Sequence, residues 1–190
     1  MRLTYRYRLS ITKAERTSLE RTLESCRWLY NKTLEIRKNT WEQEQKSVGR
    51  YDTVNMIPQW KAENPTLSNV HSQVLQEVCT RVDLAYQAFF RRVKAGEEKV
   101  GYPRFKGYGR YDSFTYPQSG FRLDDDRLTL SKIGTIRVKL HRPSPPTKLR
   151  MLAGVLHWST PEVQRKCVPV AIQLFPKTCL FVSMIALTAA

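Results

Sequence analysis

The chain has 190 residues and a hydrophobic fraction of 41%, enough for one ordinary domain or two small ones with a packed core. Its 32 lysines and arginines outnumber its 17 aspartates and glutamates, which gives a formal net charge of +15. This composition excludes wholesale disorder and predicts a polyanionic partner, with nucleic acid favoured over an acidic membrane surface. A basic protein that is merely soluble is the alternative.

The N-terminus and the cysteines indicate a cytoplasmic protein without a metal site. Arg2, Arg6 and Arg8 interrupt every apolar run at the N-terminus, so no signal peptide is predicted. The four cysteines are widely spaced, with no Cys-x-x-Cys pair and no histidine at zinc-ligand spacing. The apolar stretch 179–190 is shorter than the roughly 20 residues of a spanning helix. We therefore expect no membrane segment, no cofactor and no small-molecule substrate.

The first 45 residues predict a strand followed by a helix. Residues 3–9 alternate between an apolar face and a basic face, the pattern of a half-buried strand. Thr12 and Glu15 have capping-box spacing, so the helix is expected to begin there. Its apolar stripe continues to about Gln45, either unbroken or divided near Ser25 into two consecutive helices.

A second helical region follows a polar connection. A short helix is predicted around residues 56–62, ended by Asn64 and Pro65. A long helix is predicted for residues 68–95, with Gly96 as its stop. Its expected buried stripe is Val74, Val78, Val82, Ala85, Phe89 and Val93.

After Gly96 the apolar period changes from that of a helix to that of strands. Short strands are predicted at residues 111–116, 121–123, 127–130 and 133–140, and the last of these has one apolar and one basic face. Asp124, Asp125 and Asp126 are interpreted as a hairpin turn. A metal-dependent nuclease site is the alternative, but adjacent carboxylates in a hairpin diverge and no partner carboxylate is evident.

The densest functional signal lies in residues 89–106, where cations and aromatic residues are interleaved. Lysine and arginine side chains there would neutralise phosphates, and Tyr102, Phe105 and Tyr108 would stack on unpaired bases. Phe89 and Phe90 are expected to belong to the core instead. No nucleophile–base order, phosphate-binding loop or dinucleotide fingerprint is present, so no catalytic residue is predicted.

Several separated motifs, in order, carry a family resemblance across residues 1 to about 143. They are Cys26-Arg27-Trp28-Leu29-Tyr30-Asn31, Ser72-Gln73-Val74-Leu75-Gln76, Phe89-Phe90-Arg91-Arg92, Gly101-Tyr102-Pro103-Arg104-Phe105-Lys106, Tyr111-Asp112-Ser113-Phe114 and Lys132-Ile133-Gly134. In these the chain resembles the N-terminal half of TnpB proteins, the transposon-encoded OrfB-type proteins long described as transposases and related to type V CRISPR effectors.

The resemblance implies an α+β fold: a small wedge-type, OB-like β-barrel with an inserted helical recognition lobe. Residues 1–9 would supply the first barrel strand, residues 10–96 the helical lobe and residues 97–143 the remaining strands. Residues 144–190 resemble nothing in the family, and we expect a divergent tail that is poorly ordered or read out of frame.

The family's activity is RNA-guided cleavage of DNA, so the implied partners are guide RNA and double-stranded DNA. The implied location is the cytoplasm of a bacterium or archaeon, in association with the nucleoid. By the motif match, the nucleic-acid-binding residues are Ser72, Gln73, Gln76, Arg91, Arg92, Lys94, Arg104, Phe105, Lys106, Phe114, Thr115 and Tyr116. The amides of Gln73 and Gln76 suit hydrogen bonds to base edges, with an ordinary exposed helix face as the alternative.

The family's RuvC-like nuclease motifs do not occur in this sequence. The favoured hypothesis is a binding module that does not cleave. Alternatives are a nuclease subunit completed by a separate RuvC-like half, and an inactive fragment beside an intact relative.

Overall fold

A computed structural model describes residues 2–98, 100–140, 170–174 and 180–187, with side chains described for residues 7–98 and 100–140. Contacts divide the chain into two compact units. The sheet unit combines residues 1–23 with residues 112–190, and the helical unit comprises residues 24–111. Each is described by itself below.

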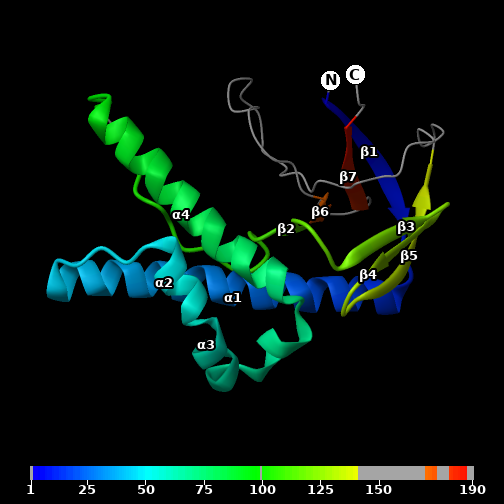
Figure 1. Ribbon diagram of the computed structural model, residues 1–190, viewed down its shortest axis with the longest axis horizontal. Helices are drawn as coiled ribbons and strands as arrows, with labels where there is room; N and C mark the ends of the chain where they lie inside the picture. Colours follow the sequence, from blue (N-terminus) through cyan, green and yellow to red (C-terminus); the bar gives the residue numbers. More distant parts are fainter. Residues whose placement is uncertain (1, 99, 141–169, 175–179, 188–190) are drawn as a thin grey trace. The chain divides into compact units, whose positions relative to one another are not determined.

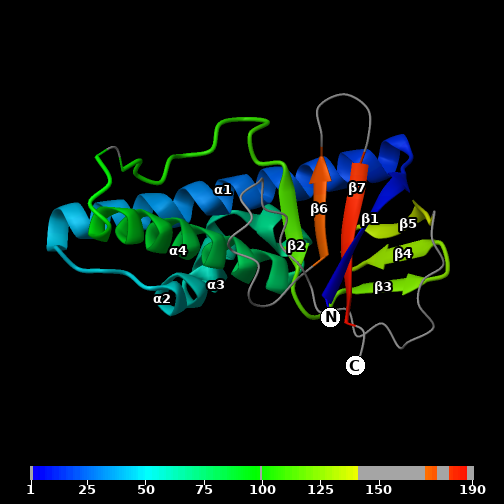
Figure 2. The ribbon, with the colours of Figure 1, turned by 90° about the horizontal axis from the view of Figure 1, so that it is seen from above.

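The sheet unit contains one seven-stranded antiparallel sheet in the order β2-β6-β7-β1-β5-β4-β3, which can be followed in Figure 2. The strands are β1 (Arg2–Ser10), β2 (Ser113–Tyr116), β3 (Phe121–Asp124), β4 (Arg127–Leu130), β5 (Gly134–Lys139), β6 (Val170–Leu174) and β7 (Leu180–Leu187). Because β1 pairs with both β5 and β7, the first strand of the chain joins the two halves of the sheet.

Alternation along these strands builds the core of the sheet unit. In register, Leu9 lies opposite Val138 and Leu128 lies opposite Ile136. All four side chains are buried, whereas their neighbours along the strands are exposed, so one face is apolar and the other polar, as residue alternation predicts.

The sheet confirms the α+β class but is open, since β2 and β3 end the strand order without pairing to each other. Closure into an OB-like barrel therefore stays a prediction, as does the proposed division into four segments. Within the expected tail, residues 170–174 and 180–187 form β6 and β7. The other residues of that stretch lie outside the described part of the chain.

Helix α1 (Lys13–Glu44) begins at the predicted capping box and runs unbroken, as Figure 1 shows. The Thr12 backbone N–H donates to Glu15 Oε2 at 2.6 Å, and the Glu15 N–H donates to Thr12 Oγ1 at 3.3 Å. The alternative with a break near Ser25 is wrong. Ser25 and its neighbours Leu23, Cys26 and Leu29 are all buried, so the helix keeps a continuous packed face there.

In the helical unit, α2 (Arg50–Asn55), α3 (Ile57–Glu63) and the 3-10 helix η1 (Pro65–Asn69) precede α4 (Ser72–Lys94). Helix α2 was not predicted, and it packs against α4. Helix α4 begins at Ser72 rather than Ser68, because η1 occupies residues 65–69. The core is formed by Leu29, Leu34, Trp60, Leu67, Val74, Leu75, Val78, Cys79 and Val82.

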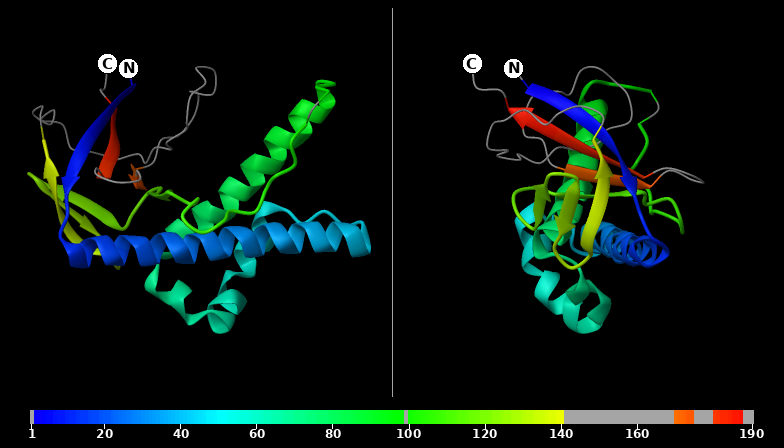
Figure 3. Two further views of the ribbon diagram at one scale, coloured as in Figure 1. Left: turned by 180° about the vertical axis from the view of Figure 1, so that it is seen from behind. Right: turned by 90° about the vertical axis from the view of Figure 1, so that its right-hand side faces the viewer.

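The buried stripe of α4 is shorter than predicted. Val74, Val78 and Val82 are buried, whereas Val93 is half exposed. Past the last of these buried valines, α4 contacts α1 through Arg37 and also packs against a loop segment, which Figure 3 shows returning along the helix. None of the helices in the described part of the chain is both long and apolar enough to cross a membrane.

Candidate nucleic-acid interface

The polar face of the sheet unit carries four exposed cations, which we call the basic sheet face: Arg8, Arg127, Arg137 and Lys139. Arg8 lies directly opposite Lys139, and Arg127 lies directly opposite Arg137. Like charges placed directly opposite each other destabilise a sheet. This arrangement is therefore expected to favour the binding of an anion, which would relieve the repulsion.

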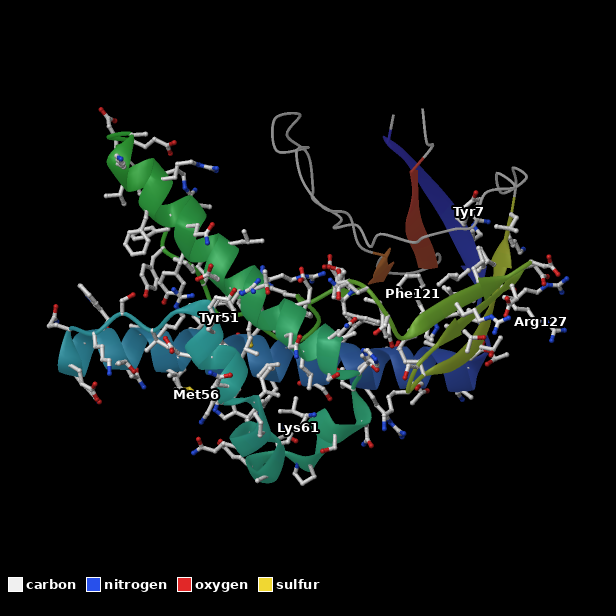
Figure 4. The ribbon with its side chains drawn as sticks, in the orientation of Figure 1. Tyr7, Tyr51, Met56, Lys61, Phe121 and Arg127 are labelled. Carbon is white, nitrogen blue, oxygen red and sulfur yellow. The ribbon has the colours of Figure 1, made fainter. Side chains whose placement is uncertain are left out.

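Carboxylates bond to, or lie directly opposite, two cations of the basic sheet face. Arg137 Nε donates to Asp126 Oδ2 at 2.8 Å, and Asp124 lies opposite Arg127 in register but accepts from Arg122 Nε. Beside Arg127 and Arg137 the surface is hollowed by about 630 Å³, a space that Ser10, Ile11, Thr12, Glu15 and Thr135 also line. Figure 4 shows Arg127 directed away from the strands.

In the helical unit, the cationic motifs meet at the loop segment 97–111, which is tied down near both ends. Near its start, Arg92 donates to the Ala88 carbonyl at 3.2 Å and to the Gly101 carbonyl at 3.3 Å. The Tyr86 and Tyr102 hydroxyls are hydrogen bonded at 2.6 Å. Arg92, predicted to hold a phosphate, therefore already connects α4 to the loop segment.

The second attachment uses the first motif of the resemblance. The Asn31 amide accepts from the Lys106 backbone N–H at 2.8 Å and donates to the Lys106 carbonyl at 2.9 Å. Arg27 donates to the same carbonyl at 3.2 Å. Further on, the Tyr30 and Tyr111 rings lie 5.8 Å apart. Arg27 and Asn31 of α1 thus hold the loop segment in place at Lys106. The sequence alone did not reveal this structural role.

Between and around these attachments, the loop segment presents its functional candidates to solvent. Arg104 and Phe105 are exposed between the two attachments, and Tyr108 is exposed just after them. Arg91 and Lys94 are exposed on the last turns of α4. The Lys106 side chain is half-buried, with its Nζ 6.0 Å from the centre of the Tyr30 ring.

The predicted base-reading residues lie at the start of α4. Ser72 and Gln76 are both exposed and are four residues apart, so they share one face of the helix. Gln73 is half-buried. Because the helix begins at Ser72, these side chains lie in its first two turns, where an amide can extend into a groove.

The structure argues against a direct role for β2. Phe114, Thr115 and Tyr116 are each only 1% exposed, and the Tyr116 hydroxyl donates to the Ser131 carbonyl at 2.8 Å. These side chains were expected to contact a duplex, but all three are buried in β2, the strand at one end of the sheet, where it pairs with β6. We therefore leave all three out of the proposed interface.

Two kinds of side chain with catalytic potential, the aspartates of residues 124–126 and the cysteine thiols, are in environments that do not favour catalysis. Asp124 and Asp126 bond to Arg122 and Arg137, and Asp125 has φ 48° in the hairpin turn, in agreement with the turn interpretation. In the described part of the chain, no three metal-ligating side chains converge. Burial raises the pKa of the Cys26 thiol to about 12 and that of Cys79 to about 11, so both thiols are protonated.

Comparison with known proteins finds one family model and two relatives that match this chain. A family model described as a helix-turn-helix domain, of the OrfB type, matches residues 1–46. InsQ of Escherichia coli K12, a candidate RNA-guided DNA endonuclease, is 28% identical over 142 residues, which are 73% of this chain and 34% of that protein. A Streptomyces pristinaespiralis protein with the same description is 30% identical over 145 residues, which are 74% of this chain and 35% of that protein.

About three quarters of the chain is homologous to these RNA-guided DNA endonucleases, and the family model of the OrfB type matches at the N-terminus. The chain spans about a third of the length of the TnpB-type relatives that it matches. The residues matched by the helix-turn-helix model form β1 and the unbroken helix α1, so residues 2–46 contain no turn between helices.

Proposed function

We propose that the chain is a nucleic-acid-binding part of a TnpB-type protein, which binds guide RNA, target-adjacent duplex DNA or both, and does not cleave them. The proposal goes beyond nucleic-acid binding in general because the relatives are described as RNA-guided DNA endonucleases. It is supported by the surface chemistry of each unit taken separately.

The observation that carries the proposal is the opposed cation pairs of the basic sheet face. A folded protein with this arrangement bears a repulsion that a row of phosphates would relieve. In B-form DNA and in RNA helices, phosphates follow one another along the backbone. Arg8, Arg127, Arg137 and Lys139 lie on three adjacent strands of one face and can therefore contact several phosphates at once.

The helical unit supplies a second cationic surface. Arg91, Lys94, Arg104 and Arg110 are exposed, and none of them forms an ion pair with a described carboxylate. Exposed guanidinium and ammonium groups of this kind release counterions from a phosphate backbone, which strengthens binding at low salt. Ser72 and Gln76 would then read base edges of the duplex.

Salt-dependent binding tests the proposal. Binding of a structured RNA and of a 30-base-pair duplex would be measured between 50 and 200 mM NaCl for the whole chain. Two double variants remove cations from the proposed surfaces: Arg127→Gln/Lys139→Gln and Arg91→Gln/Arg104→Gln. Each lost phosphate contact should lower the slope of log K against log salt by about 0.9 on duplex DNA.

The matched control removes two exposed cations at the far end of α1 and just beyond it. Lys38→Gln/Lys46→Gln has the same net charge as either test variant, so a general charge effect would reduce binding equally in all three. Equal losses would contradict the proposed surfaces. Absence of binding at 50 mM NaCl by folded wild-type protein would contradict the function, and metal-dependent cleavage of either substrate would contradict the non-cleaving role.

A further inference from the structure

Four aromatic rings gather where the second half of α4 meets the loop segment 97–111, and we call them the aromatic cluster: Tyr86, Phe89, Phe90 and Tyr102. The Phe89 ring lies 5.2 Å from the Phe90 ring and 5.3 Å from the Tyr102 ring, both in edge-to-face geometry. The Tyr86 ring lies 5.6 Å from Tyr102 and 6.3 Å from Phe90. Each ring thus contacts at least two others.

The base of the aromatic cluster is rigidly held. Tyr86 is buried, and the Arg37 guanidinium lies 4.3 Å from the centre of its ring. Arg37 is fixed in turn by a 2.9 Å ion pair with Asp83. The Tyr86 hydroxyl is hydrogen bonded to the Tyr102 hydroxyl, so the loop segment cannot move without disturbing the cluster.

Two rings of this cluster remain open to solvent. Phe90 is 59% exposed and Tyr102 is 42% exposed, and Val93, three residues beyond Phe90 on α4, is half exposed as well. Phe90 was expected in the core, but its ring lies largely at the surface of the helical unit. Rings that are fixed from below and exposed above present flat, pre-ordered faces, which bind an aromatic ligand at little cost in conformational entropy.

The charges around the aromatic cluster determine the occupant. No aspartate or glutamate occurs between Asp83 and Glu97, whereas Arg91, Arg92 and Lys94 lie in that interval. Arg91 and Lys94 are exposed beside Phe90 in sequence. Exposed rings flanked by cations suit a strand in which unpaired bases stack on the rings while its phosphates contact the cations.

We propose that the aromatic cluster is a stacking site for the unpaired bases of a single-stranded nucleic acid, with Phe90 and Tyr102 as the stacking faces. Paired bases do not fit, because their faces are covered by neighbouring base pairs. The inference rests on the proposed function, since it names the form of nucleic acid that this part of the helical unit binds.

The test separates bases from phosphates. The probes are a 20-nucleotide oligo(dT) and an abasic strand of the same length, which carries the same phosphates without bases. Wild type should bind oligo(dT) at least fivefold more tightly than the abasic strand, since stacking contributes severalfold or more per base. Phe90→Leu should remove most of this preference while leaving binding of the abasic strand within twofold.

Tyr51→Leu is the matched control, because Tyr51 is an exposed aromatic residue of α2 outside the cluster (Figure 4). It should leave the preference for oligo(dT) unchanged. Since Phe90 is exposed, its replacement by leucine is not expected to unfold the protein, and circular dichroism of both variants would check this.

Equal binding of the two strands by wild type, or equal loss in Phe90→Leu and Tyr51→Leu, would overturn the stacking site while leaving the proposed function intact. Failure of wild type to bind either strand, or any RNA or duplex, would overturn both. Unchanged oligo(dT) binding in Phe90→Leu would also overturn the stacking site, and would indicate an apolar protein segment as the occupant of the cluster.

Discussion

Lys139→Gln is expected to stabilise the folded chain while weakening nucleic-acid binding. Lys139 lies directly opposite Arg8 across β1 and β5 and shares a face with Arg137, two residues away on β5. Two unit charges about 6 Å apart in water repel by about 0.7 kcal/mol, and physiological salt reduces this by roughly half. Removing one cation should therefore raise the free energy of unfolding by a few tenths of a kcal/mol, in the range known for cross-strand pairs.

The assay is urea unfolding at 20 mM and 1 M NaCl, combined with duplex DNA binding. The gain in stability should be present at 20 mM NaCl and vanish at 1 M, where the screening length is about 3 Å. In the Lys139→Gln variant, the magnitude of the slope of log K against log salt should be smaller than in wild type by about 0.9. If Lys139→Gln both stabilises the fold and weakens binding of duplex DNA, the opposed cations contribute to binding at a cost in stability.

Arg122→Gln is the matched control on the same sheet. Arg122 lies opposite Thr129 and bonds to Asp124 at 2.8 Å, so its loss removes an attraction and not a repulsion. It should lower the free energy of unfolding slightly or leave it unchanged. If Lys139→Gln and Arg122→Gln shift stability in the same direction, or the gain persists at 1 M NaCl, the reasoning about opposed cations is refuted.

Three further outcomes are expected. Asn31→Ala should lower the free energy of unfolding by about 1–3 kcal/mol, because two hydrogen bonds to the Lys106 backbone are lost, and should speed hydrogen exchange at the Lys106 amide. Thr12→Ala should cost about 0.5–2 kcal/mol in urea unfolding through loss of the α1 cap, whereas Thr12→Ser should cost little. Burial raises the pKa of both thiols, Cys26 to about 12 and Cys79 to about 11. Because the unfolded thiols ionise at lower pH than the folded ones, the free energy of unfolding should be unaffected by these groups below pH 9 and should fall above it. Peptide mapping after alkylation at pH 8 should find both unmodified in folded protein, and labelling as fast as in urea would contradict their burial.

Local periodicity predicted most of the elements of this chain, although α2, β6 and β7 were not predicted. The alternation of residues 3–9 and the capping pair at Thr12 predicted β1 and the start of α1, because both signals depend on neighbours within four residues. The strands after Gly96 were located to within a few residues for the same reason. The separated motifs also sufficed for the TnpB resemblance.

Tertiary structure alone decided which functional candidates are exposed and which already have a partner within the chain. Arg91 and Arg92 are adjacent in sequence, yet Arg91 is free to meet a phosphate while Arg92 bonds to the Gly101 carbonyl. Phe90 was expected in the core and is exposed, whereas Phe114 was expected at a duplex and is buried. Side-chain chemistry is written in the sequence, but exposure depends on which distant strand or loop packs alongside, and no local pattern contains that information.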